Sequence, residues 1–186
     1  MTITGGTRPE SLRGRIAVPT LITDINDILN QFARAFVGTV TSDREIALPE
    51  ALVRDDLDGT LESLHTVDRY LQELHTHRHE LTPLTWDTTV LWCGAYVGEV
   101  IRHTREGDFT WIDYNDYVLR RPEVKQLIPQ RTVTTCALLI GPNHSMSMPL
   151  NKVARFIEDG PEHSVHFFAR CDLKNREQKR AHPGCL

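Results

Sequence analysis

The first half of the chain repeats apolar residues with the spacing of an α-helix. Between Leu21 and Phe36 they recur every three or four positions, which makes one face of the predicted helix apolar. Gly38 follows as a stop signal, and Pro83 separates two later stretches that have the same period. The pattern predicts about four helices, at residues 21–37, 50–56, 58–78 and 86–103, with Thr85 as the expected cap of the last.

The second half of the chain changes to the period of β-strands. Strands are predicted at 109–114, 132–140 and 164–169, with a short helix from Pro149 to Gly160 before the last of them. Helices therefore come first and strands second. This order predicts an α+β fold, in which an N-terminal helical layer packs on a small, mostly antiparallel sheet of three or four strands.

The same patterns divide the chain into three parts. Residues 1–18 are polar and contain Gly and Pro, so we expect a flexible arm. Residues 19–172 form a single α+β domain, and residues 173–186 form a charged tail that is expected to fray. The expected core includes Ile25, Phe32, Leu64, Leu71, Val97, Ile101, Ala137, Leu139, Val165 and Phe167.

Composition and charge narrow the class of protein. The 186 residues are 40% hydrophobic and 25% charged, which suits a globular protein with a sizeable core. A net charge of −4 gives no general attraction to nucleic acid or to anionic membranes. No signal-peptide pattern opens the chain, and no apolar run approaches the ~18 residues of a membrane span. Cys93, Cys136, Cys171 and Cys185 form no CxxC pair, so we expect free thiols and a cytoplasmic location.

Three histidines stand close together at the end of the predicted 58–78 helix. His75 and His79 have the spacing of helical zinc ligands, whereas His77 points to the opposite side. The pair is therefore a candidate metal site. The alternative is a solvated helix end, where histidine interacts favourably with the negative end of the helix dipole.

Two glycines lie four residues apart within the predicted 86–103 helix. Gly94 and Gly98 share one face, and each costs roughly 1 kcal/mol of helix stability relative to alanine. Close approach of another backbone, or of a ligand, would explain them. Glu99 and His103 are also four apart, as a base and its orienting partner can be, although such a pair is more often a surface contact.

The segment after this helix combines aromatic and acidic residues. Trp111, Asp113, Tyr114, Asp116 and Tyr117 could form a recognition surface for a basic protein partner. The alternative is that the aromatic residues belong to the core and the two aspartates to turns.

One stretch of the chain resembles a family of small uncharacterised bacterial α+β domains. The resemblance rests on residues 94–102, which begin Gly-Ala-Tyr and include Gly98-Glu99, on Trp111 and on residues 149–160, and it covers roughly residues 60–170. Several such domains look like immunity proteins or accessory proteins of bacterial conflict systems. The resemblance transfers no catalytic residues to this sequence.

The leading functional hypothesis is a non-enzymatic bacterial protein that binds a protein partner, of the immunity type that the resemblance implies. Neither a GxSxG motif nor a phosphate-binding glycine loop is present, and no cofactor is expected. The alternative hypothesis is a metal-dependent, hydrolase-like enzyme with zinc at the histidine-rich helix end.

Overall fold

The computed structural model describes residues 24–105 and 108–181, with side chains up to residue 174. The predicted arm over residues 1–18 lies outside the described residues. The α-helices are α1 (Ile25–Val37), α2 (Leu64–Thr76), α3 (Pro83–Thr104), α4 (Tyr114–Arg120), α5 (Pro149–Asp159) and α6 (Val165–Ala181). The strands are β1 (Thr110–Asp113), β2 (Ala137–Ile140) and β3 (Met146–Ser147). The 3-10 helices are η1 (Pro49–Ala51), η2 (Arg54–Asp56), η3 (Arg78–Glu80), η4 (Pro122–Gln126), η5 (Pro142–His144) and η6 (Pro161–His163).

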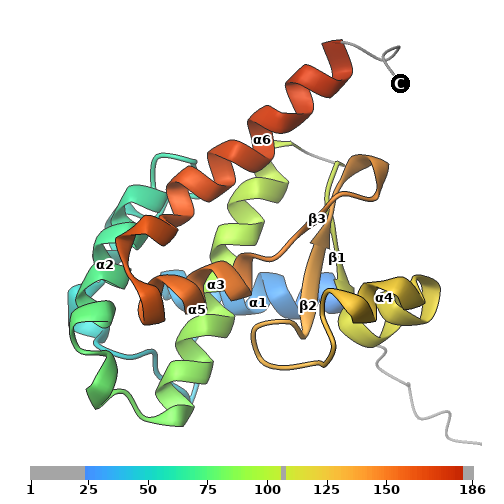
Figure 1. Cartoon of the computed structure of the whole chain (residues 1–186). Helices are drawn as coiled ribbons and strands as arrows, with labels where there is room; N and C mark the ends of the chain where they lie inside the picture. Colours follow the sequence, from blue (N-terminus) through green and yellow to red (C-terminus); the bar gives the residue numbers. More distant parts are fainter. Residues whose placement is uncertain (1–23, 106–107, 182–186) are drawn as a thin grey trace, which may run out of the picture.

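Helix α3 is the central element of the fold, with α1, α5 and α6 packed around it (Figure 1). Almost every residue from Thr88 to Ile101 is buried, and a helix that is apolar on all sides needs neighbours on all sides. Thr82 caps its start, because its hydroxyl accepts a hydrogen bond from the Thr85 N–H at 3.2 Å. Pro83 takes the first helical position, where its missing N–H costs nothing. The helix thus begins earlier than the cap predicted at Thr85.

The sheet has two apolar faces, as expected of strands that are buried between two layers. Its strand order is β1-β2-β3, and both pairs are antiparallel. Trp111 lies opposite Leu139, and both side chains belong to the main core. Ile112 lies opposite Leu138, and these two belong to a second, smaller core that α4 and η4 complete. The predicted α+β fold with a small antiparallel sheet is confirmed.

The strand predicted at 132–140 is shorter than expected. Only Ala137–Ile140 is extended, and the preceding threonines form a turn. The Thr135 hydroxyl accepts a hydrogen bond from the Thr132 N–H at 2.7 Å and donates one to the Gln130 carbonyl at 3.0 Å. β-Branched residues favour strands, but a threonine hydroxyl can also bind nearby backbone groups, and here it does so.

The strand predicted at 164–169 is wrong, because this segment is the start of α6. Asp68 of α2 holds the helix start: its carboxylate accepts hydrogen bonds from the Val165 N–H at 2.7 Å and the Ser164 hydroxyl at 2.6 Å. Val165, Ala169 and Leu173 recur every fourth residue and are buried, whereas Phe167, predicted as core, is 62% exposed. The predicted charged tail from residue 173 also begins inside this helix, which continues to Ala181.

The two glycines of α3 make room for close neighbours. A Cβ atom on Gly94 would lie 2.7 Å from the Cα atom of Leu150 in α5. A Cβ atom on Gly98 would lie 2.0 Å from Cζ2 of the Trp111 indole. The structure therefore shows packing at both positions: a helix backbone approaches Gly94, and an aromatic ring lies directly on Gly98.

Replacement of Gly98 by alanine tests the contact with the indole. We expect Gly98→Ala to lower the free energy of unfolding by ~1–3 kcal/mol through overpacking, which outweighs a gain of up to about 1 kcal/mol from helix propensity. Urea denaturation followed by circular dichroism measures the change. The double variant with Trp111→Leu should lose less than the sum of the two single variants, because the smaller side chain leaves room for the methyl group. A single Gly98→Ala variant more stable than the wild type would contradict this packing.

Candidate functional site

A polar cluster from α1 and α3 holds Trp111 from two sides. The indole Nε1–H donates a hydrogen bond to Glu99 Oε1 at 2.8 Å, and Glu99 is only 4% exposed. The Asn30 amide donates to Glu99 Oε2 at 3.2 Å, and Arg102 Nε lies 3.5 Å from Oε1. A buried carboxylate is costly unless it is paired and hydrogen-bonded, and these three neighbours satisfy Glu99.

The Asn26 side chain of α1 forms hydrogen bonds with the backbone of Trp111. Its Oδ1 accepts a hydrogen bond from the Trp111 N–H at 2.9 Å, and its Nδ2 donates to the Trp111 carbonyl at 3.4 Å. The amide thus takes the place that a neighbouring strand would have at the open edge of β1. Arg102 Nη1 donates to Asn26 Oδ1 at 2.7 Å, which links this contact to the Glu99 cluster.

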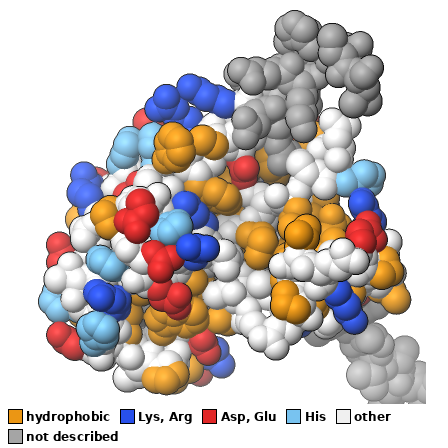
Figure 2. Space-filling view, in the orientation of Figure 1, with side chains coloured by type: hydrophobic (Ala, Val, Ile, Leu, Met, Phe, Trp, Pro, Cys, Tyr) orange, Lys and Arg blue, Asp and Glu red, His pale blue; other side chains and the backbone are white. Residues whose placement is uncertain are grey.

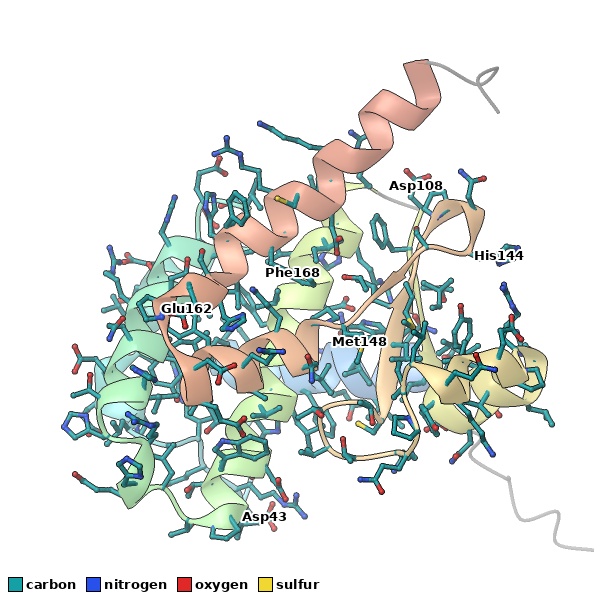
Figure 3. The ribbon with its side chains drawn as sticks, in the orientation of Figure 1. Asp43, Asp108, His144, Met148, Glu162 and Phe168 are labelled. Carbon is teal, nitrogen blue, oxygen red and sulfur yellow. The ribbon has the colours of Figure 1, made fainter. Side chains whose placement is uncertain are left out.

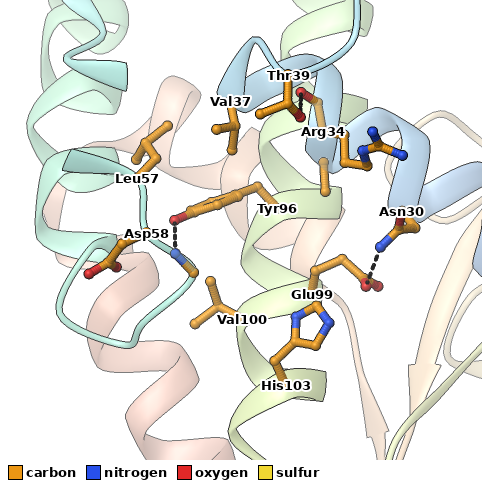
Figure 4. Close-up of a pocket in the computed structure, with 12 residues that line it drawn as sticks. Asn30, Arg34, Val37, Thr39, Leu57, Asp58, Tyr96, Glu99, Val100 and His103 are labelled. Atoms are coloured by element: carbon orange, nitrogen blue, oxygen red, sulfur yellow. Dashed lines mark hydrogen bonds between the residues drawn. The ribbon is translucent and has the colours of Figure 1, made fainter. Parts of the chain in front are cut away.

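A pocket of about 220 Å³ opens beside this cluster, between α1, α3 and the 57–59 loop (Figure 4). Asn30, Arg34, Glu99 and His103 form its polar side, and Val37, Leu57, Tyr96 and Val100 form its apolar side. The Tyr96 hydroxyl accepts a hydrogen bond from the Gly59 N–H at 3.1 Å and shares one of 2.6 Å with Ser63. Burial raises the pKa of Tyr96, so the phenol stays protonated and fixes the loop.

The pocket brings Glu99 and His103 together on one wall, but not as the pair that the sequence suggested. In the described part of the chain, Glu99 takes its hydrogen bonds from Trp111 and Asn30, and His103 is exposed at the rim. The Glu99 carboxylate is thus occupied by hydrogen bonds that hold Trp111 in the core. The volume is also below the ~300–1,000 Å³ of most ligand pockets, so the geometry suits at most a very small amphipathic molecule.

The predicted zinc pair is not formed. Helix α2 ends at Thr76, so His75 is helical while His79 belongs to η3, and the two no longer share a helical face. His75 Nδ1 lies 3.0 Å from the carbonyl oxygen of Ile157 in α5 and is engaged there. Within residues 24–105 and 108–174, no three His, Cys, Asp or Glu side chains are grouped as metal ligands.

The aromatic residues predicted to meet a partner are part of the protein's own cores. Trp111, Tyr114 and Tyr117 are all buried. Asp113 caps α4 by accepting a hydrogen bond from the Asn115 N–H at 2.8 Å, and it forms an ion pair with Arg131 at 3.2 Å. The predicted recognition surface is therefore wrong for these residues, because large aromatic rings gain more from burial than from solvent exposure.

The two most exposed of the large apolar side chains lie instead on α4 and just after η4. Leu119 is 81% exposed and Leu127 is 78% exposed. Four residues are packed against the second core but only partly buried: Ile112, Ile140, Met146 and Met148. We call these six residues the lobe surface. Figure 2 shows hydrophobic side chains grouped over the sheet and α4, whereas charged side chains gather over the helices on the other side.

No protein-family model, curated protein or solved structure matches this chain. No described helix combines the length and apolar character that crossing a bilayer requires. Cys93, Cys136 and Cys171 are free thiols. Burial raises the pKa of the Cys93 and Cys136 thiols, so both are poor nucleophiles.

The signal for the lobe surface was present in the sequence but was weak. The two methionines follow a strand, in a loop where such side chains can make adaptable contacts. Leu119 and Leu127 carried no signal, because a single exposed leucine in a helical stretch cannot be told from a core leucine without the packing around it.

Substitution of Glu99 by glutamine tests whether its charge holds Trp111. We expect Glu99→Gln to lower the free energy of unfolding by about 1–3 kcal/mol, because the new amide nitrogen cannot accept a hydrogen bond from Trp111 or Asn30. Urea denaturation gives the value. The control is Glu123→Gln, an exposed carboxylate paired with Arg121, which should change stability by less than ~0.5 kcal/mol. Equal losses in the two variants would show that the buried cluster has no special role.

Proposed function

We propose that this protein is a non-enzymatic partner-binding protein and that the lobe surface is its contact site. The observation that carries the proposal is the exposure of Leu119 and Leu127, which at 81% and 78% are the most exposed large apolar side chains of the described residues. They lie on α4 and just after η4, the elements that cover the second core, and four isoleucine and methionine side chains packed against that core are only partly buried. Exposed apolar surface favours association with another molecule.

The shape of the region suits a protein segment. Beside Leu119, a groove of about 370 Å³ runs between α4 and the 125–131 segment, with Val118 and Pro129 among its walls. An apolar side chain of a partner fits such a groove, as anchor residues do in many interfaces. Methionine side chains next to it adapt to partner shape at low cost.

The charges around the groove set the chemistry of the partner. Asp113 is paired with Arg131, and Glu123 with Arg121. Arg120 and Lys125 are exposed and form no ion pair within the described part of the chain. We therefore propose a partner whose apolar anchors are flanked mainly by carboxylates, with a basic group opposite Asp116, which is exposed on α4 and has no ion pair in the described part of the chain.

The family resemblance supports a finer proposal. In it, the protein is an immunity or accessory protein of a bacterial conflict system and acts in the cytoplasm. The partner would then be a toxin domain or another component of that system, and the lobe surface would be covered when the complex forms. Among the described residues no group of three or more His, Cys, Asp or Glu side chains is placed to hold a metal ion, so no observation favours the alternative of a metal-dependent hydrolase.

Photo-crosslinking in the native host tests the contact site. A benzoylphenylalanine placed at position 119 or 127 should give one discrete adduct, whereas the same group at position 84 should give none. Leu84 is the matched control, since it is a 62% exposed leucine at the start of α3. For the partner identified from that adduct, Leu119→Asp should weaken binding at least about tenfold by calorimetry, as loss of an anchor does. Equal adducts at 119 and 84, or equal affinities of Leu119→Asp and Leu84→Asp, would contradict the proposal.

A further inference from the structure

Three side chains form a chain of polar contacts at the junction of α5 and η6. Lys152 Nζ lies 3.2 Å from His163 Nδ1. On the other side of the same ring, His163 Nε2 lies 3.3 Å from Asp159 Oδ2. Arg155 Nη2 also contacts Asp159 Oδ2 at 3.0 Å and fixes the carboxylate. The order is therefore carboxylate, imidazole, amine.

The local sequence explains how these groups meet. Asp159 ends α5 two turns after Lys152, so both lie on one side of the helix. Gly160 then takes a φ of +119°, which side chains on an L-residue rarely allow, and reverses the chain. Pro161 starts η6, and this short turn returns His163 to the face of α5 that carries Lys152.

The hydrogen bond with Lys152 assigns the tautomer of His163. A lysine ammonium can only donate, so Nδ1 accepts and a neutral ring carries its proton on Nε2, the atom that faces Asp159. Nδ1 then presents a lone pair to Lys152 Nζ. A base within hydrogen-bond distance of a nucleophile, and held by a third group, is the arrangement that activates nucleophiles in enzymes.

The surroundings of Lys152 also favour its neutral amine. The side chain is half-buried, which favours the neutral form. The Phe168 ring of α6, whose centre lies 6.0 Å from Nζ, opposes this, because a cation–π contact stabilises the ammonium. Burial, and then Arg155, lower the pKa of Lys152, while Asp68 of α2, Cys171 of α6 and Glu162 of η6 oppose the shift. Side chains of α5, η6 and α6 meet here between the labelled Glu162 and Phe168 (Figure 3).

We propose that Lys152 is a nucleophilic amine that captures small aldehydes or ketones as an imine, with His163 as its base and Asp159 as the group that positions His163. The ammonium gives one proton to His163 Nδ1, and the free amine adds to the carbonyl carbon. The carbinolamine then loses water, whose oxygen comes from the carbonyl, and a carbon–nitrogen double bond remains. No oxidant or reductant takes part. This site is separate from the lobe surface and does not depend on it.

Reductive alkylation of the whole chain with propanal and cyanoborohydride tests the proposal. The chain has four lysines, so peptide mass spectrometry resolves each site, and exposed Lys125 serves as the reference within the same molecule. At pH 7 we expect Lys152 to react severalfold faster than Lys125, because His163 activates its amine and burial lowers its pKa. As pH rises through the ordinary lysine value of about 10.4, the ratio should fall, because Lys125 also becomes neutral.

Two variants test whether Lys152 reacts faster because His163 activates it or only because its side chain is accessible. His163→Gln should remove the advantage of Lys152 at pH 7 and leave the rate at Lys125 unchanged. Asp159→Asn should reduce the advantage in part, because the ring stays in place but loses its fixed tautomer. Thermal melts confirm that both variants fold, and the Lys125 rate reports any general loosening. A Lys152 rate at or below that of Lys125 in the wild type, or an unchanged ratio in His163→Gln, would overturn the proposal.

Discussion

The contact between the Trp111 indole and the Gly98 position of α3 is the interaction on which the rest of the structure depends. The ring lies where a side chain of α3 would otherwise be, so strand and helix approach more closely than ordinary side chains allow. Glu99, one residue further along α3, then accepts the indole N–H. Two neighbouring residues of α3 thus set the position and orientation of β1. Gly98 leaves the space that the indole occupies, and Glu99 orients the indole through its hydrogen bond.

The two apolar faces of the sheet are covered to different extents once β1 is held in this way. The inner face, with Trp111 and Leu139, joins the main helical core. On the outer face, Leu138 is covered by α4 and η4, but Ile112 and Ile140 are only partly covered. The part of this face that α4 and η4 do not cover therefore stays partly open to solvent.

The C-terminal region shows how distant polar groups override local preference. Residues 164–169 combine β-branched and aromatic residues, which favour a strand. The Asp68 carboxylate, 97 positions before Val165, binds the N–H of that residue and starts a helix. Three buried residues at intervals of four then keep the start of α6 on the core, although the C-terminal end of the helix extends away from the domain in Figure 1. The same helix supplies Phe168, which lies over Lys152.

The sequence by itself determined the elements whose signals are local. The helical period of α1 and α3, the stop at Gly38 and the α5 helix between Pro149 and Gly160 all follow from residues within one or two turns of each other. The need for a close neighbour at Gly94 and Gly98 was also visible, because glycine in a helix interior is costly unless something occupies the space.

Only the tertiary structure decided which neighbours those signals would meet. The indole on Gly98, the Asn26 amide 85 positions before Trp111, and the carboxylate that starts α6 all come from distant parts of the chain. The end of α2 at Thr76 separated His75 from His79, and a turn at Gly160 brought His163 to Lys152. The physical reason is that period and turn residues describe a segment, whereas burial, capping and hydrogen bonding depend on what the rest of the chain places against it.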